Sequence, residues 1–372
     1  MRKLDNYSIL IVSQYFKTTE DFINIICVCK KFEETTLKYR YNPIELKVNQ
    51  RLFPKLETWC IYNIQRKLEV PNTIGLARIC FPATPSHKKE VLSVIKNAKF
   101  VYNTNAPSTG SMPNMKNLNM LSFHSLSKLV LQDVVIPPQI IKFESCCFES
   151  NRSIQHVTLL ASVTVLPQST FNDCMSLQQV VLPNYILSIG DKCFSNCPTL
   201  VDINIPTNLR SIGKSAFRKC KNLQNLLLPS SLTIINDFAF SLCTSLKDIQ
   251  LQGDMAVIKN SSFFMCKSIT SMQIPSSITL IENEAFRGCS SLTSINLERV
   301  VSIGRKAFSE CNSLSEIYFP RALLSIGESG FSHCYNLSKL LCESTHIDMG
   351  RFCFYETKIK VDSSFLAVFH SC

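Results

Sequence analysis

Residues 188–209 read Ser-Ile-Gly-Asp-Lys-Cys-Phe-Ser-Asn-Cys-Pro-Thr-Leu-Val-Asp-Ile-Asn-Ile-Pro-Thr-Asn-Leu, and this stretch decides the fold. The same pattern begins again 23 residues later at Ser211, as Ser-Ile-Gly-Lys-Ser-Ala-Phe-Arg-Lys-Cys-Lys-Asn-Leu. One phenylalanine marks each copy: Phe148, Phe171, Phe194, Phe217, Phe240, Phe263, Phe286, Phe308, Phe331 and Phe354. Eight of the nine steps between these phenylalanines are 23 residues long and one is 22. Such a fixed period predicts a solenoid, in which each copy forms one coil.

Further columns of apolar residues repeat with the phenylalanine. A cysteine follows three residues later, at Cys174, Cys197, Cys220, Cys243, Cys266, Cys289, Cys311 and Cys334. A leucine or isoleucine comes next, at Leu177, Leu200, Leu223, Leu246, Ile269, Leu292, Leu314 and Leu337. Two apolar residues spaced i and i+2 then follow, at Val180/Leu182, Ile203/Ile205, Leu226/Leu228, Ile249/Leu251, Met272/Ile274, Ile295/Leu297 and Ile317/Phe319. This spacing places both side chains on one face of a β-strand.

Proline and glycine recur at fixed positions of the repeat. Proline is predicted to end the strand, because it cannot donate a ladder hydrogen bond. It stands after the strand at Pro183, Pro206, Pro229, Pro275 and Pro320. The dipeptide Ile-Gly recurs at 189/190, 212/213, 303/304 and 326/327, where we expect glycine to supply a turn conformation closed to residues with a Cβ. Each coil is thus predicted to hold one short strand and one turn-rich or briefly helical return. Stacked coils share one core, so the predicted fold class is an α/β solenoid with one parallel β-sheet.

The pattern Ile-Gly-x-x-Ala-Phe-x-x-Cys-x-x-Leu-x-x-Ile-x-Leu-Pro resembles the BspA-type leucine-rich repeat family, first known from bacterial surface antigens and expanded in parasitic protists. The resemblance covers about residues 143–361 of the 372 in the chain. It implies cell-surface display and adhesion or binding of host proteins.

The net charge of +11 is unevenly distributed along the chain. Residues 1–160 hold 21 Lys and Arg against 12 Asp and Glu, whereas residues 161–372 hold 18 against 16. The repeat array is therefore close to neutral, which argues against an extended face for nucleic-acid phosphates. We expect no nucleic acid among the partners.

The cysteines number eighteen, and eight of them form the single column described above. This column is predicted to be a buried ladder of small apolar side chains, because free cysteine packs as a small hydrophobe. Disulfides between neighbouring rungs stay an alternative, since adjacent coils lie about one strand spacing apart. No cysteine spacing matches a zinc site. A mostly reduced, intracellular type of chain is the simpler interpretation.

Targeting signals are weak in this sequence. Met1-Arg2-Lys3 is basic, but polar residues from Asp5 to Gln14 interrupt the apolar region that follows, so no secretory signal is predicted. There is no run of ~18 apolar residues, so we expect no transmembrane segment. A prenylation box needs a cysteine fourth from the end, where Phe369 stands, so no lipidation box is expected. These signals favour a cytoplasmic protein, whereas the family resemblance implies the cell surface.

Residues 1–48 are predicted to form a helical module, in which Thr18-Thr19-Glu20-Asp21 starts a helix. Residues 4–41 are similar to an F-box, a small adaptor of ubiquitin ligases, although Asp5 stands where the F-box proline is expected. The alternative is a cap that shields the apolar edge of the first coil. The predicted domains after it are degenerate leucine-rich repeats at 49–142 with a surface loop near 103–114, regular repeats at 143–361, and a C-terminal cap or tail at 362–372.

Nothing in the sequence predicts an enzyme. It has no hydrolase elbow, Walker loop, Rossmann glycine set or His-Glu-x-x-His motif. The six histidines are scattered, and only His333 falls inside a clear repeat, beside Cys334 of the core column. Catalysis needs convergent groups in a pocket, whereas this chain spreads its polar groups along a ribbon. We therefore expect no catalytic residue, no cofactor and no metal ligand.

Function is expected on the outward positions of the strands. The candidate partner-binding residues are Asn204, Lys247, Asp248, Gln250, Gln273, Asn296, Glu316 and Tyr318. Their polar groups can hydrogen-bond an extended partner, and tyrosine is enriched at binding hot spots; the alternative is a solvated face with amides stacked as a ladder. The predicted function is a non-enzymatic scaffold that binds partner proteins on this face, with surface adhesion implied by the resemblance. The alternative is an intracellular substrate-recognition adaptor, which would bind a ubiquitin-ligase subunit through residues 4–41.

Overall fold

The computed structural model describes residues 58–61, 76–79, 99–102, 118–121, 126–127, 129–360 and 369–370. The chain divides into two compact units, one of residues 1–108 with 113–126 and one of residues 109–112 with 127–372. In the first unit four strands pair in parallel and in chain order: β1 (Thr58–Ile61), β2 (Leu76–Ile79), β3 (Lys99–Tyr102) and β4 (Leu118–Leu121).

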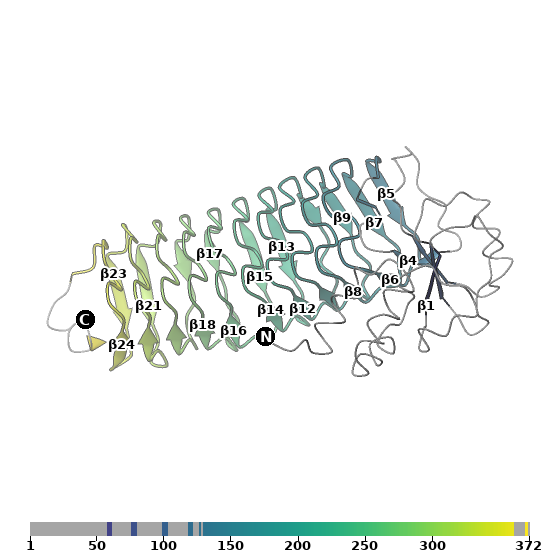
Figure 1. Cartoon of the computed structure of the whole chain (residues 1–372). Helices are drawn as coiled ribbons and strands as arrows, with labels where there is room; N and C mark the ends of the chain where they lie inside the picture. The colour runs from purple at the N-terminus through teal and green to yellow at the C-terminus, as the bar shows by residue number, and fades with distance from the viewer. Residues whose placement is uncertain are drawn as a thin grey trace, which may run out of the picture. The chain divides into compact units, whose positions relative to one another are not determined.

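The second unit is a solenoid whose coils each contribute two strands (Figure 1). One row, the long-strand ladder, contains β5 (Asp133–Ile136), β7 (His156–Leu159), β9 (Gln179–Val181), β11 (Asp202–Ile203), β13 (Asn225–Leu228), β15 (Asp248–Leu251), β17 (Ser271–Met272), β19 (Ser294–Ile295), β21 (Glu316–Phe319) and β23 (Lys339–Cys342). The other row, the short-strand ladder, contains β6 (Lys142–Phe143), β8 (Val165–Leu166), β10 (Ser188–Ile189), β12 (Ser211–Ile212), β14 (Ile234–Ile235), β16 (Val257–Ile258), β18 (Leu280–Ile281), β20 (Ser302–Ile303), β22 (Ser325–Ile326), β24 (Ile347–Met349) and β25 (Phe369–His370).

The second row of strands corrects the prediction of a single sheet. The isoleucine of the Ile-Gly dipeptide does not lie in a simple turn: Ile189 of β10 is buried and pairs in parallel register with Ile212 of β12. Two-residue strands leave almost no alternating pattern in a sequence, so their period cannot be detected there. The predicted 23-residue solenoid of parallel strands is confirmed in the described coils.

The return segment of each coil is a turn and not a helix, and no helix occurs among the described residues. The residues two before and two after each column phenylalanine have positive φ, as Lys192 (54°) and Asn196 (57°) do around Phe194. Such left-handed residues interrupt a right-handed helix. They also turn three N–H groups of the segment toward the next coil. The N–H of Phe194 donates to the Ala216 carbonyl at 2.7 Å, and the N–H groups of Lys192 and Asn196 also donate to backbone carbonyls of that coil. The helical module predicted at residues 1–48 lies outside the described residues.

The core is a column of phenylalanine rings. Nine of the ten column phenylalanines, from Phe148 to Phe331, are at most 1% exposed, and Phe354 of the last coil is half-buried. Successive rings are stacked, with centroids 4.7 to 5.7 Å apart. The column therefore buries its aromatic surface between coils, which ties each coil to both neighbours.

The cysteine column packs beside the phenylalanines as reduced thiols. The eight cysteines of the column form no disulfide, so the alternative of disulfides between rungs is not what the structure contains. Each thiol donates a weak hydrogen bond to the carbonyl of a phenylalanine in the previous coil, for example Cys220 Sγ to Phe194 O at 3.1 Å. Burial raises the pKa of Cys289 to about 12 and that of Cys220 well above its usual value. The column is thus inert as well as apolar.

The glycines of the Ile-Gly dipeptides have a different role from the one predicted. Gly213 does not have a positive φ, but a Cβ there would lie 2.5 Å from the backbone nitrogen of Asp191 in the previous coil. Gly190 and Gly327 show the same close approach, at 2.7 and 2.5 Å. Glycine is therefore needed for space between coils, and the left-handed positions are occupied almost entirely by residues with side chains.

Candidate interaction surface

The outward positions of the long-strand ladder form two parallel rows. Its strands alternate exposed and buried residues, as β13, β15 and β21 show. The first outer row consists of Asp133, His156, Gln179, Asp202, Asn225, Asp248, Ser271, Ser294, Glu316 and Lys339. The second outer row consists of Val135, Thr158, Val181, Asn204, Leu227, Gln250, Gln273, Asn296, Tyr318 and Leu341. The two rows differ in how far their polar groups are already bonded.

In the first outer row, polar side chains bond one another in pairs across adjacent coils. Gln179 Nε2 donates to Asp202 Oδ2 at 2.7 Å, and His156 Nδ1 lies 2.7 Å from Asp133 Oδ1.

The candidate residues Asp248 and Glu316 belong to such pairs. Glu316 accepts a hydrogen bond from Lys339 Nζ at 3.0 Å. Asp248 accepts one from Asn225 Nδ2 at 3.2 Å in the amide orientation of Asn225 that satisfies its neighbours. Exposed ion pairs of this kind contribute little stability, but they reduce what the row offers to a partner.

The second outer row contains both bonded and free amides. The side chain of Asn204 is committed to the array, since its Oδ1 accepts from Leu182 N at 2.7 Å and its Nδ2 donates to Leu182 O at 2.8 Å. Asn296 accepts from the backbone N–H of Glu298 at 3.0 Å. Gln250 and Gln273, by contrast, are exposed and have no side-chain hydrogen bond within the described residues.

Apolar and aromatic side chains complete the second outer row. Leu227 is 62% exposed and Tyr318 is 39% exposed. A hydrogen bond with Glu343 raises the pKa of the Tyr318 hydroxyl. Lys247 stands one residue before Asp248 of the first outer row. It is exposed and has no ion pair in the described part of the chain. Leu227, Gln250, Gln273, Asn296 and Tyr318 thus form a continuous strip over five successive coils, which we call the amide strip.

Sequence reasoning missed which polar residues bond one another. The signal was present, because Gln179 and Asp202 stand 23 residues apart with complementary groups, and so do Glu316 and Lys339. Asn204 could not be distinguished from Gln273 in this way, because its bonds go to the backbone of the previous coil.

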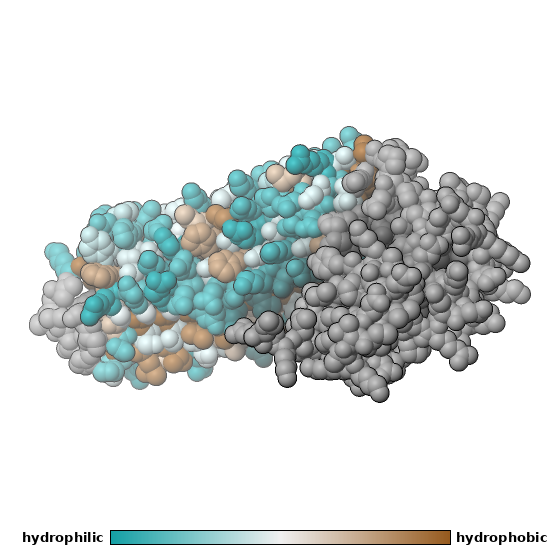
Figure 2. Space-filling view, viewed as in Figure 1, coloured by the Kyte–Doolittle hydropathy of each residue, from teal (hydrophilic) through white to brown (hydrophobic). Residues whose placement is uncertain are grey.

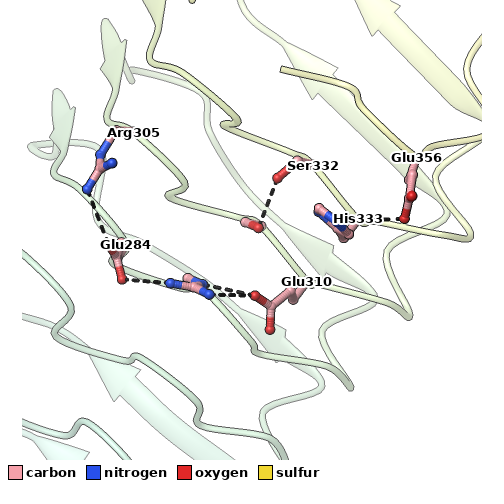
Figure 3. Close-up of polar contacts among 8 residues, drawn as sticks. Glu284, Arg305, Glu310, Ser332, His333 and Glu356 are labelled. Carbon is pink, nitrogen blue, oxygen red and sulfur yellow. Dashed lines mark hydrogen bonds and ion pairs between the residues drawn. The ribbon is translucent and has the colours of Figure 1, made fainter. Parts of the chain in front are cut away.

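The turn segments carry a separate network of charged side chains (Figure 3). Arg287 Nη2 lies 2.8 Å from Glu310 Oε1 in the next coil, and Arg287 Nη1 lies 3.2 Å from Glu284 Oε2. Arg305 pairs more loosely with Glu284, at 3.7 Å. These contacts raise the pKa of the Arg287 guanidinium further, with the hydrogen bond to Glu310 as the main cause.

The described residues offer no arrangement for metal chemistry or for a Cys–His nucleophile. No group of three or more His, Cys, Asp or Glu side chains among them could hold a metal ion. His333 Nε2 lies 3.6 Å from Glu356 Oε2, and Cys334 donates to the Phe308 carbonyl at 3.1 Å, so the two side chains have separate partners. In the same part of the chain no helix has the length and apolar character of a membrane span.

Comparison with known families assigns the repeat. The model of the BspA type leucine rich repeat region, which comprises six copies, matches residues 93–223, 164–293 and 256–364, well over half of the sequence. The chain belongs to the BspA-type leucine-rich repeat family. Proteins of this repeat type and fold are typically non-enzymatic scaffolds that bind other proteins. No curated protein sequence matches the chain.

Solved structures with a similar fold are also leucine-rich repeat proteins. A leucine-rich repeat protein from Bacteroides ovatus is 22% identical with a TM-score of 0.58, over 82% of this chain and 77% of that one. The Treponema (T. pallidum) leucine-rich repeat protein is 25% identical with a TM-score of 0.30, over 52% and 72%. The pneumococcal vaccine antigen PcpA is 16% identical with a TM-score of 0.42, over 72% and 76%. The first of these supports the fold of this BspA-type chain.

Proposed function

We propose that this BspA-type protein binds an extended segment of a partner protein along the amide strip. The observation that carries the proposal is the pair Gln250 and Gln273, whose amides are exposed and unbonded between Leu227 and Tyr318. Each amide supplies one acceptor and two donors, which suits the alternating backbone groups of an extended polypeptide.

The neighbouring rows support the choice of this strip. In the first outer row Gln179 bonds Asp202 and Lys339 bonds Glu316, so a partner would have to break those pairs before it could use them. At Gln250 and Gln273 of the amide strip a partner gains hydrogen bonds without such a loss, and it also covers Leu227 and the ring of Tyr318. Aromatic anchors flanked by polar groups are typical of binding hot spots.

A triple variant tests the amide strip. Gln250→Ala, Gln273→Ala and Tyr318→Ala together should abolish capture of partner proteins by the immobilised full-length chain, with the melting temperature unchanged. The matched control is Gln179→Ala, which removes an exposed glutamine that is already bonded to Asp202. Equal capture of the same proteins by the triple variant and the wild type would exclude the amide strip as the site.

Surface display and adhesion are the finer form of this proposal, and they are supported only by the family resemblance. Antibody binding to the repeats on intact cells would test display. The adaptor alternative depends on residues 4–41, which lie outside the described residues, and it stays a prediction. Capture of a ubiquitin-ligase subunit by the full-length chain, but not by one lacking residues 1–41, would establish it; capture by neither would leave the cap interpretation.

A further inference from the structure

The turn segments contain a group of cations that have no acidic partner. These are Lys192, Lys214, Arg218, Lys219 and Lys221, which we call the basic cluster. Four of the five belong to the coil of Phe217, and Lys192 belongs to the coil before it, whose phenylalanine ring lies 5.2 Å away. None of the five forms an ion pair anywhere in the described coils. The nearby Asp191 carboxylate instead accepts the backbone N–H of Lys214, at 2.7 Å.

The same fold shows what a paired arginine looks like at this position. Arg287 and Arg218 both directly follow their column phenylalanine. Arg287 is held by Glu284, two residues before its phenylalanine, and by Glu310 in the next coil (Figure 3). The positions that correspond to these two glutamates around Arg218 are occupied by Ser215 and Leu242. Arg218 is half-buried at the position that Arg287 has in its own coil. It lacks both of the carboxylates that pair with Arg287.

Two strained apolar residues lie in the coil next to the basic cluster. Phe238 and Leu242 flank Phe240 and have φ values of 58° and 64°. Positive φ is an outlier for bulky residues, but these two positions have it in every described coil, so the turn itself holds both apolar side chains in place. Both side chains are half-exposed, and the ammonium of Lys214 lies 5.9 Å from the ring centre of Phe238. Apolar surface therefore borders the cations. Elsewhere the solenoid surface is largely hydrophilic on the face that Figure 2 shows.

The number of successive coils that carry the cations indicates which kind of ligand can bind them. The cations stop after one coil, because the next coil presents Phe238 and Leu242 on its turn, beside the acidic Asp237. A nucleic acid or a long sulfated polysaccharide requires a row of cations that continues along the array. A short ligand with clustered carboxylates and one apolar group matches both parts of the surface.

We propose that the basic cluster, with Phe238 and Leu242, binds an acidic segment of a partner protein, whose carboxylates pair with Arg218 and the neighbouring lysines as Glu284 and Glu310 pair with Arg287. The column rings of the coils of Phe194, Phe217 and Phe240 lie 5.2 and 5.3 Å apart in turn. An extended chain rises about 3.3 Å per residue, so an aliphatic or aromatic residue two or three positions beyond the carboxylates reaches Leu242. This site lies on the turn segments and is separate from the amide strip.

The test is a selection of random short peptides, displayed on phage, on the immobilised full-length protein. We expect enrichment of peptides with two or more carboxylates followed, two or three residues later, by an apolar residue. A synthetic, fluorescently labelled form of the enriched peptide then gives the affinity by anisotropy. Raising the salt concentration should weaken its binding, since the contact is electrostatic.

The variants use residues that neighbouring coils carry at the same positions, so the fold should tolerate them. Arg218→Ser copies Ser195 and Ser241, and Lys219→Asn copies Asn196. Together they should weaken binding of the peptide at least about tenfold, because each removes a charge-assisted hydrogen bond. The matched control is Arg351→Asn, which removes a cation from the last coil. Arg351 stands three residues before Phe354, as Lys214 stands three residues before Phe217.

Three outcomes would overturn the proposal. The first is a selection that enriches no acidic peptides, and the second is equal peptide binding by the double variant and the wild type. The third is a selection without enriched peptides together with tight binding of a labelled heparin fragment, if the variant Leu242→Ser binds that fragment as tightly as the wild type. This result would indicate a site for polyanions that does not require an apolar group. Unchanged peptide binding in the amide-strip triple variant would show that the two sites are independent.

Discussion

Removal of one ring from the phenylalanine column tests the energetic picture of the array most directly. Phe217 is fully buried, and its ring stacks on Phe194 at 5.2 Å and on Phe240 at 5.3 Å. Truncation of a buried phenylalanine to alanine costs about 3–5 kcal/mol. Each stacked pair adds about 0.5–1.5 kcal/mol beyond the buried area. Because two pairs are lost, we expect Phe217→Ala to lie in the upper half of the first range.

The expected response is local, because each coil contacts only its neighbours. Hydrogen exchange followed by mass spectrometry should show faster exchange in residues 190–245, where turn amides such as Phe194 and Phe217 donate to the next coil. Protection in residues 300–350 should be kept.

The control is Phe354→Ala in the last coil. Phe354 is half-buried, stacks on Phe331 at 5.7 Å and meets Phe319 only in a tilted contact at 6.4 Å, so its loss should cost less than that of Phe217. Equal loss of protection over residues 129–360 in Phe217→Ala would refute the nearest-neighbour picture. No change near Phe217 would refute the assigned energetic role of the column.

Three further predictions follow from the packing of the coils. Burial raises the pKa of Cys174 and Cys289 from 9.0 to about 12, so the unfolded chain loses thiol protons at lower pH than the folded one. The free energy of unfolding should therefore be insensitive to these thiols below pH about 9 and should fall from there toward pH 12, which denaturant titrations at several pH values would measure; a flat profile over that window would contradict the burial argument. Asn204→Ala should lower the free energy of unfolding by about 1–2 kcal/mol, because it removes two hydrogen bonds to Leu182, whereas Gln273→Ala should leave the denaturant midpoint unchanged. Gly213→Ala should cost about 1–3 kcal/mol, because its Cβ meets the backbone at Asp191, and a variant as stable as the wild type would show that the two coils can separate without loss.

The sequence predicts those parts of the fold that recur as large apolar side chains. The phenylalanine, cysteine and leucine columns are buried as expected, because each repeats with the coil and has no polar alternative. The short strands and the left-handed turn positions were missed, because backbone geometry leaves no consistent residue type there: Lys192, Phe238 and Glu284 occupy the same left-handed position.

The candidate surface was predictable as a location but not in its details. The outward face follows from strand alternation, yet Asn204 and Gln273 look equivalent in sequence and differ in bonding. That difference depends on the distance between an amide and a backbone of the previous coil, which no local pattern encodes.

The turn hydrogen bonds have a consequence for assembly, because they all have the same polarity. In every described coil pair the N–H of the column phenylalanine points toward the C-terminal neighbour, as Phe171 does toward Cys193 and Phe308 toward Gly330. Peptide dipoles aligned in this way sum along the array, as they do along a helix, with the positive end at the C-terminal side. Two copies that joined end to end through these turns could bond only head to tail, since two donor edges cannot pair. Such a head-to-tail contact is heterologous, so it would produce rings or filaments rather than symmetric dimers.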